Sequence, residues 1–205
     1  MTLRADFVTV YHNETNYEQH KDLRRALEKY EPNGYTFIGV DNRKNNRGFG
    51  VGCNVGAFTQ GATAPIIGFL NPDTEVHGPF LHKVESALIH PVVITGCRFG
   101  KPESELRLWG VTDWVCGAAM FVSRKWFTSV NGFDPQFVWG WDETDLIRRA
   151  QVQGLRCQSI DLPIMHASPT QNSAEDTLYK QFHFNRGSQR FYSKWSRAAT
   201  GRRRR

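Results

Sequence analysis

Long apolar runs and clustered cysteines are both missing from this chain. No segment of its 205 residues approaches the roughly 18 to 20 apolar residues that a membrane-spanning helix requires. The four cysteines (Cys53, Cys97, Cys116 and Cys157) are far apart and form no CxxC pair, which favours free thiols in a reducing compartment. The first residues enter a predicted strand at once and leave no room for a signal peptide. We therefore expect a cytoplasmic location.

Acidic residues are missing from the C-terminal end of the chain. Nine of the 26 Lys and Arg residues lie from Lys180 onward, where there is no Asp or Glu, so residues 1–179 carry a net charge of −3. The body is mildly acidic and only the tail is strongly basic. This distribution disfavours nucleic acid as a partner of the domain and confines any attraction to polyanions to the C-terminus.

The hydrophobic pattern predicts one α/β domain with a mostly parallel sheet. Apolar runs at 6–11, 35–40 and 65–70 predict buried strands, and Leu23, Leu27 and Tyr30 repeat at helical spacing between the first two. Further helices are expected near 54–60, 80–89 and 142–153, and further strands at 92–95, 114–116 and 156–160. Strands that alternate with helices are typical of a mostly parallel sheet covered on both faces.

Polar residues follow three of these strands. Asn13, Asp41 and Asp73 each come just past a predicted strand end, and ligands of such sheets bind beyond the carboxyl ends of the strands. Asn71-Pro72-Asp73 also offers an amide and a carboxylate two positions apart, which suits a hard cation such as Mg²⁺ or Mn²⁺ held together with phosphates. The alternative interpretation is a simple Asn-Pro-Asp turn.

Three acids lie within residues 142–145 at the start of a predicted helix. Asp145 has Arg148 and Arg149 at pairing distance along the helix, whereas Asp142 and Glu143 lack such local partners. One of these two carboxylates could accept a proton from a hydroxyl group; stabilisation of the helix N-terminus is the alternative. His166 follows the last strand and is either a structural residue or, if it lies near Asp73, a metal ligand.

The glycine-rich stretch 46–52 does not match the common phosphate-binding loops. It lacks the Gly-Lys-Ser/Thr ending of a P-loop, and its spacing differs from a dinucleotide fingerprint. Its glycines could instead let the backbone run close to a base or ribose.

In their order along the chain, these motifs resemble a family 2 glycosyltransferase with the GT-A fold, of the rhamnosyltransferase-like branch. The resemblance spans roughly residues 6 to 195. The segments that carry it are Val8–Asn13, Val40–Asn42, Asn46–Gly56, Leu70–Val76, Gly117–Met120, Gly132–Asp134, Trp141–Leu146 and His166. It implies a GT-A domain over 1–179, with a nucleotide-binding half to about 76 and an acceptor half after it, and a basic extension over 180–205.

The resemblance also implies roles for individual residues. A nucleotide-sugar donor would be bound by Tyr11, His12, Asn13, Asp41, Asn46, Arg47, Gly48, Asn54, Asn71 and Asp73. Asp73 and His166 would hold Mn²⁺ or Mg²⁺, and Asn71 stands where the family's DxD motif has its first acid. The acidic pair is usually Glu-Asp with its second member as base, which gives Glu143, with Asp142 as the alternative. Trp114, Gly117 and Trp141 would face the acceptor.

The implied reaction is metal-assisted, inverting transfer of a sugar to a hydroxyl of a glycan, a lipid-linked acceptor or a protein. A nucleotidyltransferase would carry a glycine-rich, basic loop after the first strand, where this chain has Tyr11–Glu14. A non-catalytic sugar-nucleotide or glycan-binding module stays open, because Asn71 and the reversed acidic pair depart from the family pattern.

The tail has two interpretations. Phe184, Phe191 and Trp195 fall at helical spacing, which predicts a helix that packs its aromatic residues on the domain. The basic residues beside them could instead contact an anionic membrane peripherally. Arg186 and Arg190 could also close over the donor diphosphate. We expect Arg202–Arg205 to be disordered.

Overall fold

The computed structural model describes residues 4–59, 63–99, 110–111, 113–166 and 174–201, so Trp109 and the Arg202–Arg205 tail lie outside it. The strands are β1 Ala5–Tyr11, β2 Tyr35–Asp41, β3 Ile66–Leu70, β4 Thr74–Val76, β5 Val92–Gly96, β6 Ala119–Ser123, β7 Arg156–Ser159 and β8 Ile164–His166. The helices are α1 Glu14–Tyr30, α2 Phe49–Thr59, α3 Leu81–Ala87, α5 Arg124–Ser129, α6 Asp142–Val152 and α7 Ala174–Gly201.

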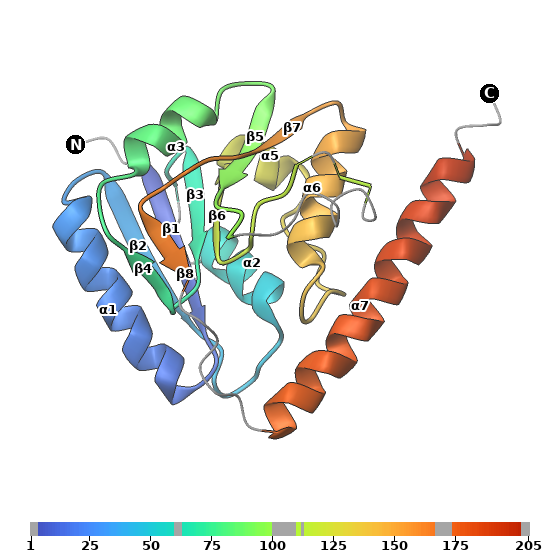
Figure 1. The fold of residues 1–205 in the computed structure, drawn as a ribbon, viewed down its shortest axis with the longest axis horizontal. Helices are drawn as coiled ribbons and strands as arrows, with labels where there is room; N and C mark the ends of the chain where they lie inside the picture. Colours follow the sequence, from blue (N-terminus) through green and yellow to red (C-terminus); the bar gives the residue numbers. More distant parts are fainter. Residues whose placement is uncertain (1–3, 60–62, 100–109, 112, 167–173, 202–205) are drawn as a thin grey trace.

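A six-stranded sheet in the order β2-β1-β3-β6-β5-β7 forms the centre (Figure 1). β6 runs antiparallel to β3 and β5, and the other pairs are parallel. β4 and β8 form a separate antiparallel ribbon. The prediction of a mostly parallel α/β sheet is confirmed.

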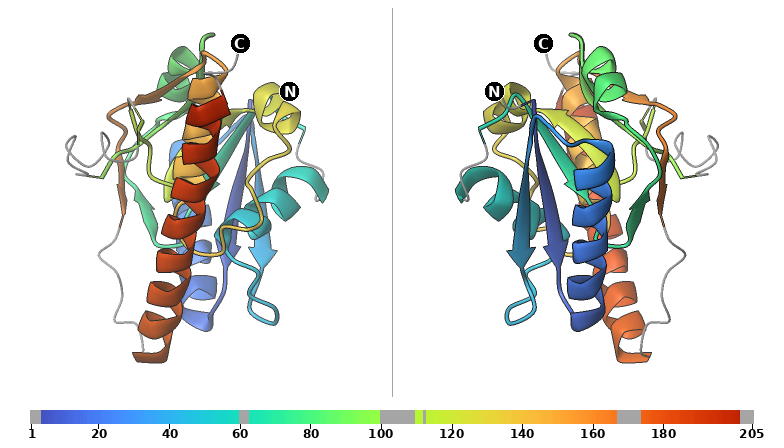
Figure 2. Two further views of the ribbon diagram at one scale, coloured as in Figure 1. Left: turned by 90° about the vertical axis from the view of Figure 1, so that its right-hand side faces the viewer. Right: turned by 90° about the vertical axis from the view of Figure 1, so that its left-hand side faces the viewer.

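Helices cover both faces of the sheet, as the side views show (Figure 2). Side chains alternate between the two faces along each strand. Phe7 of β1 therefore packs with Leu23 and Leu27 of α1, whereas Val8 packs with the α2 side. α3 lies on the same face as α1, and α5 and α6 lie on the face of α2. The carboxyl ends of β1, β2 and β3 meet at one edge of the sheet.

Two predicted elements differ from the structure. The expected strand at 114–116 is wrong, because these residues form a loop and the central strand β6 begins only at Ala119. The run from Trp114 to Val122 is continuously apolar apart from Gly117, so its pattern does not show where the turn ends. The helix expected from residue 54 begins at Phe49 instead.

The glycines of α2 serve helix packing. An added Cβ at Gly52 would lie 2.6 Å from a Val10 methyl group, and one at Gly56 would lie 2.4 Å from a Val8 methyl group. These glycines bring α2 close to β1.

α7 is docked on the body through aromatic and charged residues. Phe191 is buried and packs with Phe137, Trp141 and Trp195, which confirms that the C-terminal helix packs aromatic side chains on the domain. The boundary expected at 179/180, between the domain and its basic extension, falls inside α7, which is one continuous helix. Within the part of the chain that the structure describes, no helix is long and apolar enough to cross a bilayer.

Lys194 joins α7 to two carboxylates of the body. Its Nζ lies 2.8 Å from Oδ1 of Asp145 and 3.0 Å from Oδ2 of Asp134. Asp145 is fully buried and also accepts hydrogen bonds from Arg149 and Trp195. The predicted pairing of Asp145 with Arg149 is thus confirmed at 3.0 Å. Lys194 neutralises part of a charge that is expensive to bury without partners.

We expect Lys194→Met to lower the free energy of unfolding by about 1 to 3 kcal/mol, because a buried carboxylate loses a charged hydrogen-bond donor. Urea unfolding measures this loss. Lys21→Met is the matched control, since it removes the exposed Lys21–Glu18 pair, and such pairs contribute about 1 kcal/mol or less. Equal effects of the two substitutions would contradict the role of Lys194.

Candidate active site

One cavity of about 350 Å³ lies at the carboxyl edge of the sheet. Nine residues predicted for the site line it: His12, Asn13, Asn46, Asn71, Asp73, Gly117, Asp142, Glu143 and His166. They come from the loops after β1, β2 and β3, from the turn before β6, from α6 and from β8. The convergence expected from residues at strand ends is therefore seen for Asn13 and Asp73.

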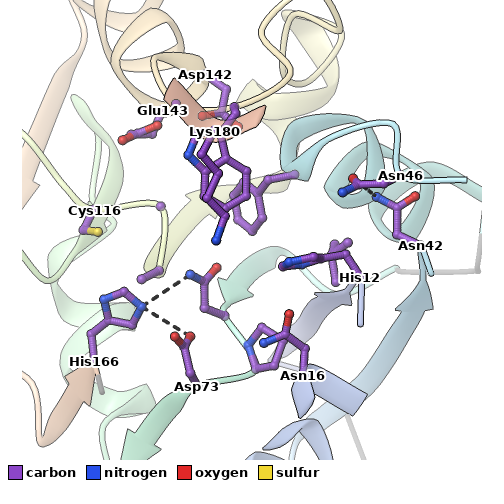
Figure 3. A pocket seen from close by; sticks show the side chains of 18 of the residues that line it. His12, Asn16, Asn42, Asn46, Asp73, Cys116, Asp142, Glu143, His166 and Lys180 are labelled. Atoms are coloured by element: carbon purple, nitrogen blue, oxygen red, sulfur yellow. Dashed lines mark hydrogen bonds and ion pairs between the residues drawn. The ribbon is translucent and has the colours of Figure 1, made fainter. Parts of the chain in front are cut away.

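Asn71-Pro72-Asp73 is both a turn and a wall of the cavity. The Thr74 amide donates to the carbonyl of Asn71 at 3.1 Å, which closes the turn and aims Asp73 into the cavity. β4 then pairs with β8 so that Thr74 lies opposite His166. This register brings Nε2 of His166 to 3.3 Å from Oδ1 of Asp73 and 3.5 Å from Nδ2 of Asn71 (Figure 3).

The donor set around Asp73 and His166 fits a divalent cation. Both side chains are partly exposed to the cavity, and their donor atoms are close enough to share one ion. No group of three or more His, Cys, Asp or Glu residues is arranged for a metal within the described parts of the chain, so remaining ligands would come from substrate oxygens and water. An imidazole suits Mn²⁺ better than Mg²⁺, which prefers oxygen ligands alone.

Asp142 and Glu143 begin α6 across the cavity from Asp73 and His166 (Figure 3). The preceding residue, Trp141, has a left-handed backbone with φ of 69°. Asp142 is only 2% exposed, and burial raises its pKa above the ordinary value. Its Oδ2 packs near Gly50 and has no hydrogen-bond partner among the described residues. Glu143 lies over Gly117, where an added Cβ would lie 3.8 Å from the Glu143 Cβ.

Asparagines form the wall next to β1 and β2. Asn13 caps α1 by accepting a hydrogen bond from the Asn16 amide at 2.8 Å, as its position before the helix predicts. The buried Asn42 donates to the carbonyl of Gly48 and to Asn46, both at 3.3 Å. Gly48 has φ of 92°, and a Cβ there would lie 2.3 Å from the carbonyl oxygen of Val138. Only glycine allows this loop to approach the α6 side of the cavity so closely.

Seven predicted site residues do not line the cavity: Tyr11, Asp41, Arg47, Gly48, Asn54, Trp114 and Trp141. Tyr11 is buried and stacks on His20 at 4.7 Å. Asp41 turns outward to Arg43, whose hydrogen bonds lower the pKa of this carboxyl to about 2. Asn54 instead holds the backbone of Phe133 through two hydrogen bonds of 2.9 Å.

The two predicted acceptor-side tryptophans are packed in the interior. The indole of Trp114 donates to Thr144 at 3.2 Å, which ties the loop before β6 to α6. Trp141 is 6% exposed and packs against Phe191 of α7. Their structural roles are to position the acidic pair.

Sequence reasoning missed several residues of the cavity. They include Asn16, Asn42 and Lys180. Asn42 directly follows β2, so its place at a strand end could have identified it from the sequence. Lys180 had no such signal, because only the docking of α7 brings it to the cavity. Of the two arginines that could close over a diphosphate, Arg190 pairs with Asp134 at 3.6 Å, and Arg186 is exposed and does not line the cavity.

Comparison with known sequences gives one partial match. A family model described as the N-terminal domain of galactosyltransferase matches residues 103–171, a range that includes Glu143 and His166 but less than half of the chain. No curated protein matches the chain significantly.

Solved structures share the fold. The β-1,4-galactosyltransferase 7 mutant of Drosophila, in complex with manganese, UDP-Gal and xylobiose, matches at 15% identity with a TM-score of 0.54, covering 87% of this chain and 79% of that one. The glycosyltransferase GlyE of Streptococcus pneumoniae matches at 11% identity with a TM-score of 0.56, covering 97% of this chain and 64% of that one. These matches show a GT-A-like fold, as expected. The narrower rhamnosyltransferase-like branch stays a prediction.

Proposed function

We propose that this protein is a glycosyltransferase that moves a sugar from a nucleoside-diphosphate donor to an acceptor hydroxyl. The observation that carries the proposal is one cavity with a carboxylate–imidazole pair, Asp73 and His166, facing an acidic pair, Asp142 and Glu143. The partial match to a galactosyltransferase domain and the GT-A-like fold support it.

Asp73 and His166 would hold Mn²⁺ or Mg²⁺ together with the donor. Such an ion supplies positive charge that offsets the charge on the departing diphosphate. Asn71, beside His166, can direct its amide toward the donor. The manganese and UDP-galactose present with the Drosophila enzyme are therefore the first ligands to try with this chain.

Glu143 is the proposed general base. In the inverting reaction the acceptor oxygen bonds to the anomeric carbon, the bond from that carbon to the diphosphate oxygen breaks, and Glu143 takes the hydroxyl proton. Glu143 is partly exposed, whereas Oδ2 of Asp142 is buried. The more accessible carboxylate can meet an acceptor without rearrangement of α6.

Release of nucleoside diphosphate from a panel of nucleotide sugars, with Mn²⁺ or with EDTA, tests the function. We expect wild type to turn over a donor only with the metal, and Asp73→Ala to lower turnover at least about a hundredfold because it removes the one carboxylate of the pair. Thermal unfolding checks that the variant folds. Donor binding without turnover under any of these metal conditions would favour the binding-module interpretation.

Substitution of each acid separates the two candidate bases. Glu143→Gln should lower kcat at least about a hundredfold while the KM for the donor changes little, because the amide keeps the shape but cannot take the proton. Asp142→Asn should retain more activity. A larger loss of kcat for Asp142→Asn than for Glu143→Gln would assign the base to Asp142. An NMR spectrum that shows a product with retained anomeric configuration would contradict the single displacement.

We also propose that the outer face of α7 makes a peripheral contact with an anionic membrane. Leu178 and Phe182, one turn apart, are 72% and 60% exposed, and the chain from Lys180 onward has no acidic residue. Arg186, one turn after Phe182, is exposed, although Glu175 and Asp176 precede Leu178. Exposed apolar side chains next to basic residues are features by which amphipathic helices bind such surfaces.

Co-sedimentation with vesicles tests this contact. The protein should bind vesicles that contain phosphatidylserine more strongly than pure phosphatidylcholine vesicles, and the double substitution Leu178→Ser and Phe182→Ser should abolish the difference. Ile89→Ser, at a residue 66% exposed elsewhere on the surface, is the matched control. If the double variant binds as the control does, the membrane contact is wrong.

A further inference from the structure

The cavity contains a single strongly basic side chain among its described lining residues. Asp73, Asp142 and Glu143 supply three carboxylates, and Lys180 is the one Lys or Arg residue beside them. A diphosphate adds further negative charge to a cavity whose walls are already acidic. Charged phosphate oxygens in such a place need positive partners.

Other cations near this edge of the sheet do not line the cavity. Arg43 forms ion pairs of 2.7 Å with both Asp41 and Glu14, and Arg190 pairs with Asp134. Arg47 is exposed and does not line the cavity. Lys180 differs from these cations because it lines the cavity.

The docking of α7 points Lys180 into the cavity. Gly187, Phe191 and Lys194 follow Lys180 by seven, eleven and fourteen positions, a spacing that puts all four residues on one face of a helix. Phe191 is buried, Lys194 is bound to Asp145, and an added Cβ at Gly187 would lie 3.0 Å from the Trp141 ring. These contacts fix the rotation of α7.

Within the cavity, Lys180 lies beside an aromatic wall. Its Nζ is 4.8 Å from the centre of the Trp139 ring, and Trp139 meets His12 edge-on with ring centres 6.2 Å apart. Figure 3 shows Lys180 reaching into the cavity from the side of Asp142 and Glu143, toward the side formed by Asp73 and His166. The attraction between a cation and the face of an indole helps to hold the cation in position.

We propose that Lys180 is a diphosphate-binding residue, whose ammonium donates to the phosphate oxygens of the donor across the cavity from Asp73 and His166. This inference rests on the proposed function, which it deepens by assigning a second positive contact, supplied by the C-terminal helix. A compact ammonium group suits this task, because it contacts phosphate as a point charge. The same contact would stabilise the nucleoside diphosphate as it leaves.

Calorimetric titration with nucleoside diphosphates in the presence of Mn²⁺ tests the proposal. A panel of UDP, GDP, CDP, ADP and dTDP first identifies the one that wild type binds. Lys180→Met should weaken its binding about tenfold to a hundredfold, the effect of losing a hydrogen bond to a charged group, and Lys180→Arg should restore most of the affinity. Binding of the corresponding nucleoside, which has no phosphate, should not change.

Lys29→Met is the matched control. Lys29 is exposed on α1, outside the cavity, and its Nζ also lies over an aromatic ring, 4.6 Å from the centre of Tyr30. This variant should bind the nucleoside diphosphate as wild type does. Lys180→Met with wild-type affinity, or with an equal loss for the nucleoside, would overturn the role of Lys180 alone. Wild type that binds no nucleoside diphosphate would overturn the proposed function and this inference with it.

Discussion

The pairing of β4 with β8 is the interaction on which the candidate site depends, because it joins two segments far apart in the sequence. Thr74 lies opposite His166, and Asp73 therefore meets the imidazole at 3.3 Å. Each strand has only three residues, so the ribbon is too short to be stable alone. Val76 and Ile164 anchor it in the core that Phe7, Leu23 and Leu27 also form. The geometry of the Asp73–His166 pair is thus held by ordinary hydrophobic packing.

The opposite wall depends on α7. This helix packs Phe191 on Trp141, the residue before the acidic pair, and Lys194 on the buried Asp145 in the first turn of α6. Trp141 has a left-handed backbone, a conformation that surrounding contacts must maintain for a bulky residue. The C-terminal helix therefore positions Asp142 and Glu143 and delivers Lys180 to the same cavity. The same helix therefore contributes to the packing of the domain and to the lining of the candidate site.

Much of the fold could be predicted from the sequence because its signals are local. β1, α1, β2 and β3 show clear hydrophobic periodicity, and Asn13 before α1 is a recognisable cap. β6 could not be placed, because the apolar run before it has no clear boundary. The residues alone did not place His166 beside Asp73, since strand pairing over such a separation leaves no local pattern; only the family resemblance implied that the two share a metal. Lys180 was missed for a similar reason: its place follows from how α7 docks through Gly187 and Phe191.

The proposed reaction requires that Asp73 and His166 jointly bind a divalent cation with the donor diphosphate. A crystal structure with Mn²⁺ and the nucleoside diphosphate that the chain binds, with anomalous diffraction to locate manganese, tests it most directly. We expect an anomalous peak within coordination distance of Asp73 Oδ1 and His166 Nε2, with phosphate oxygens as further ligands. A peak bound elsewhere, or a diphosphate in the cavity with neither side chain at the metal, would contradict it.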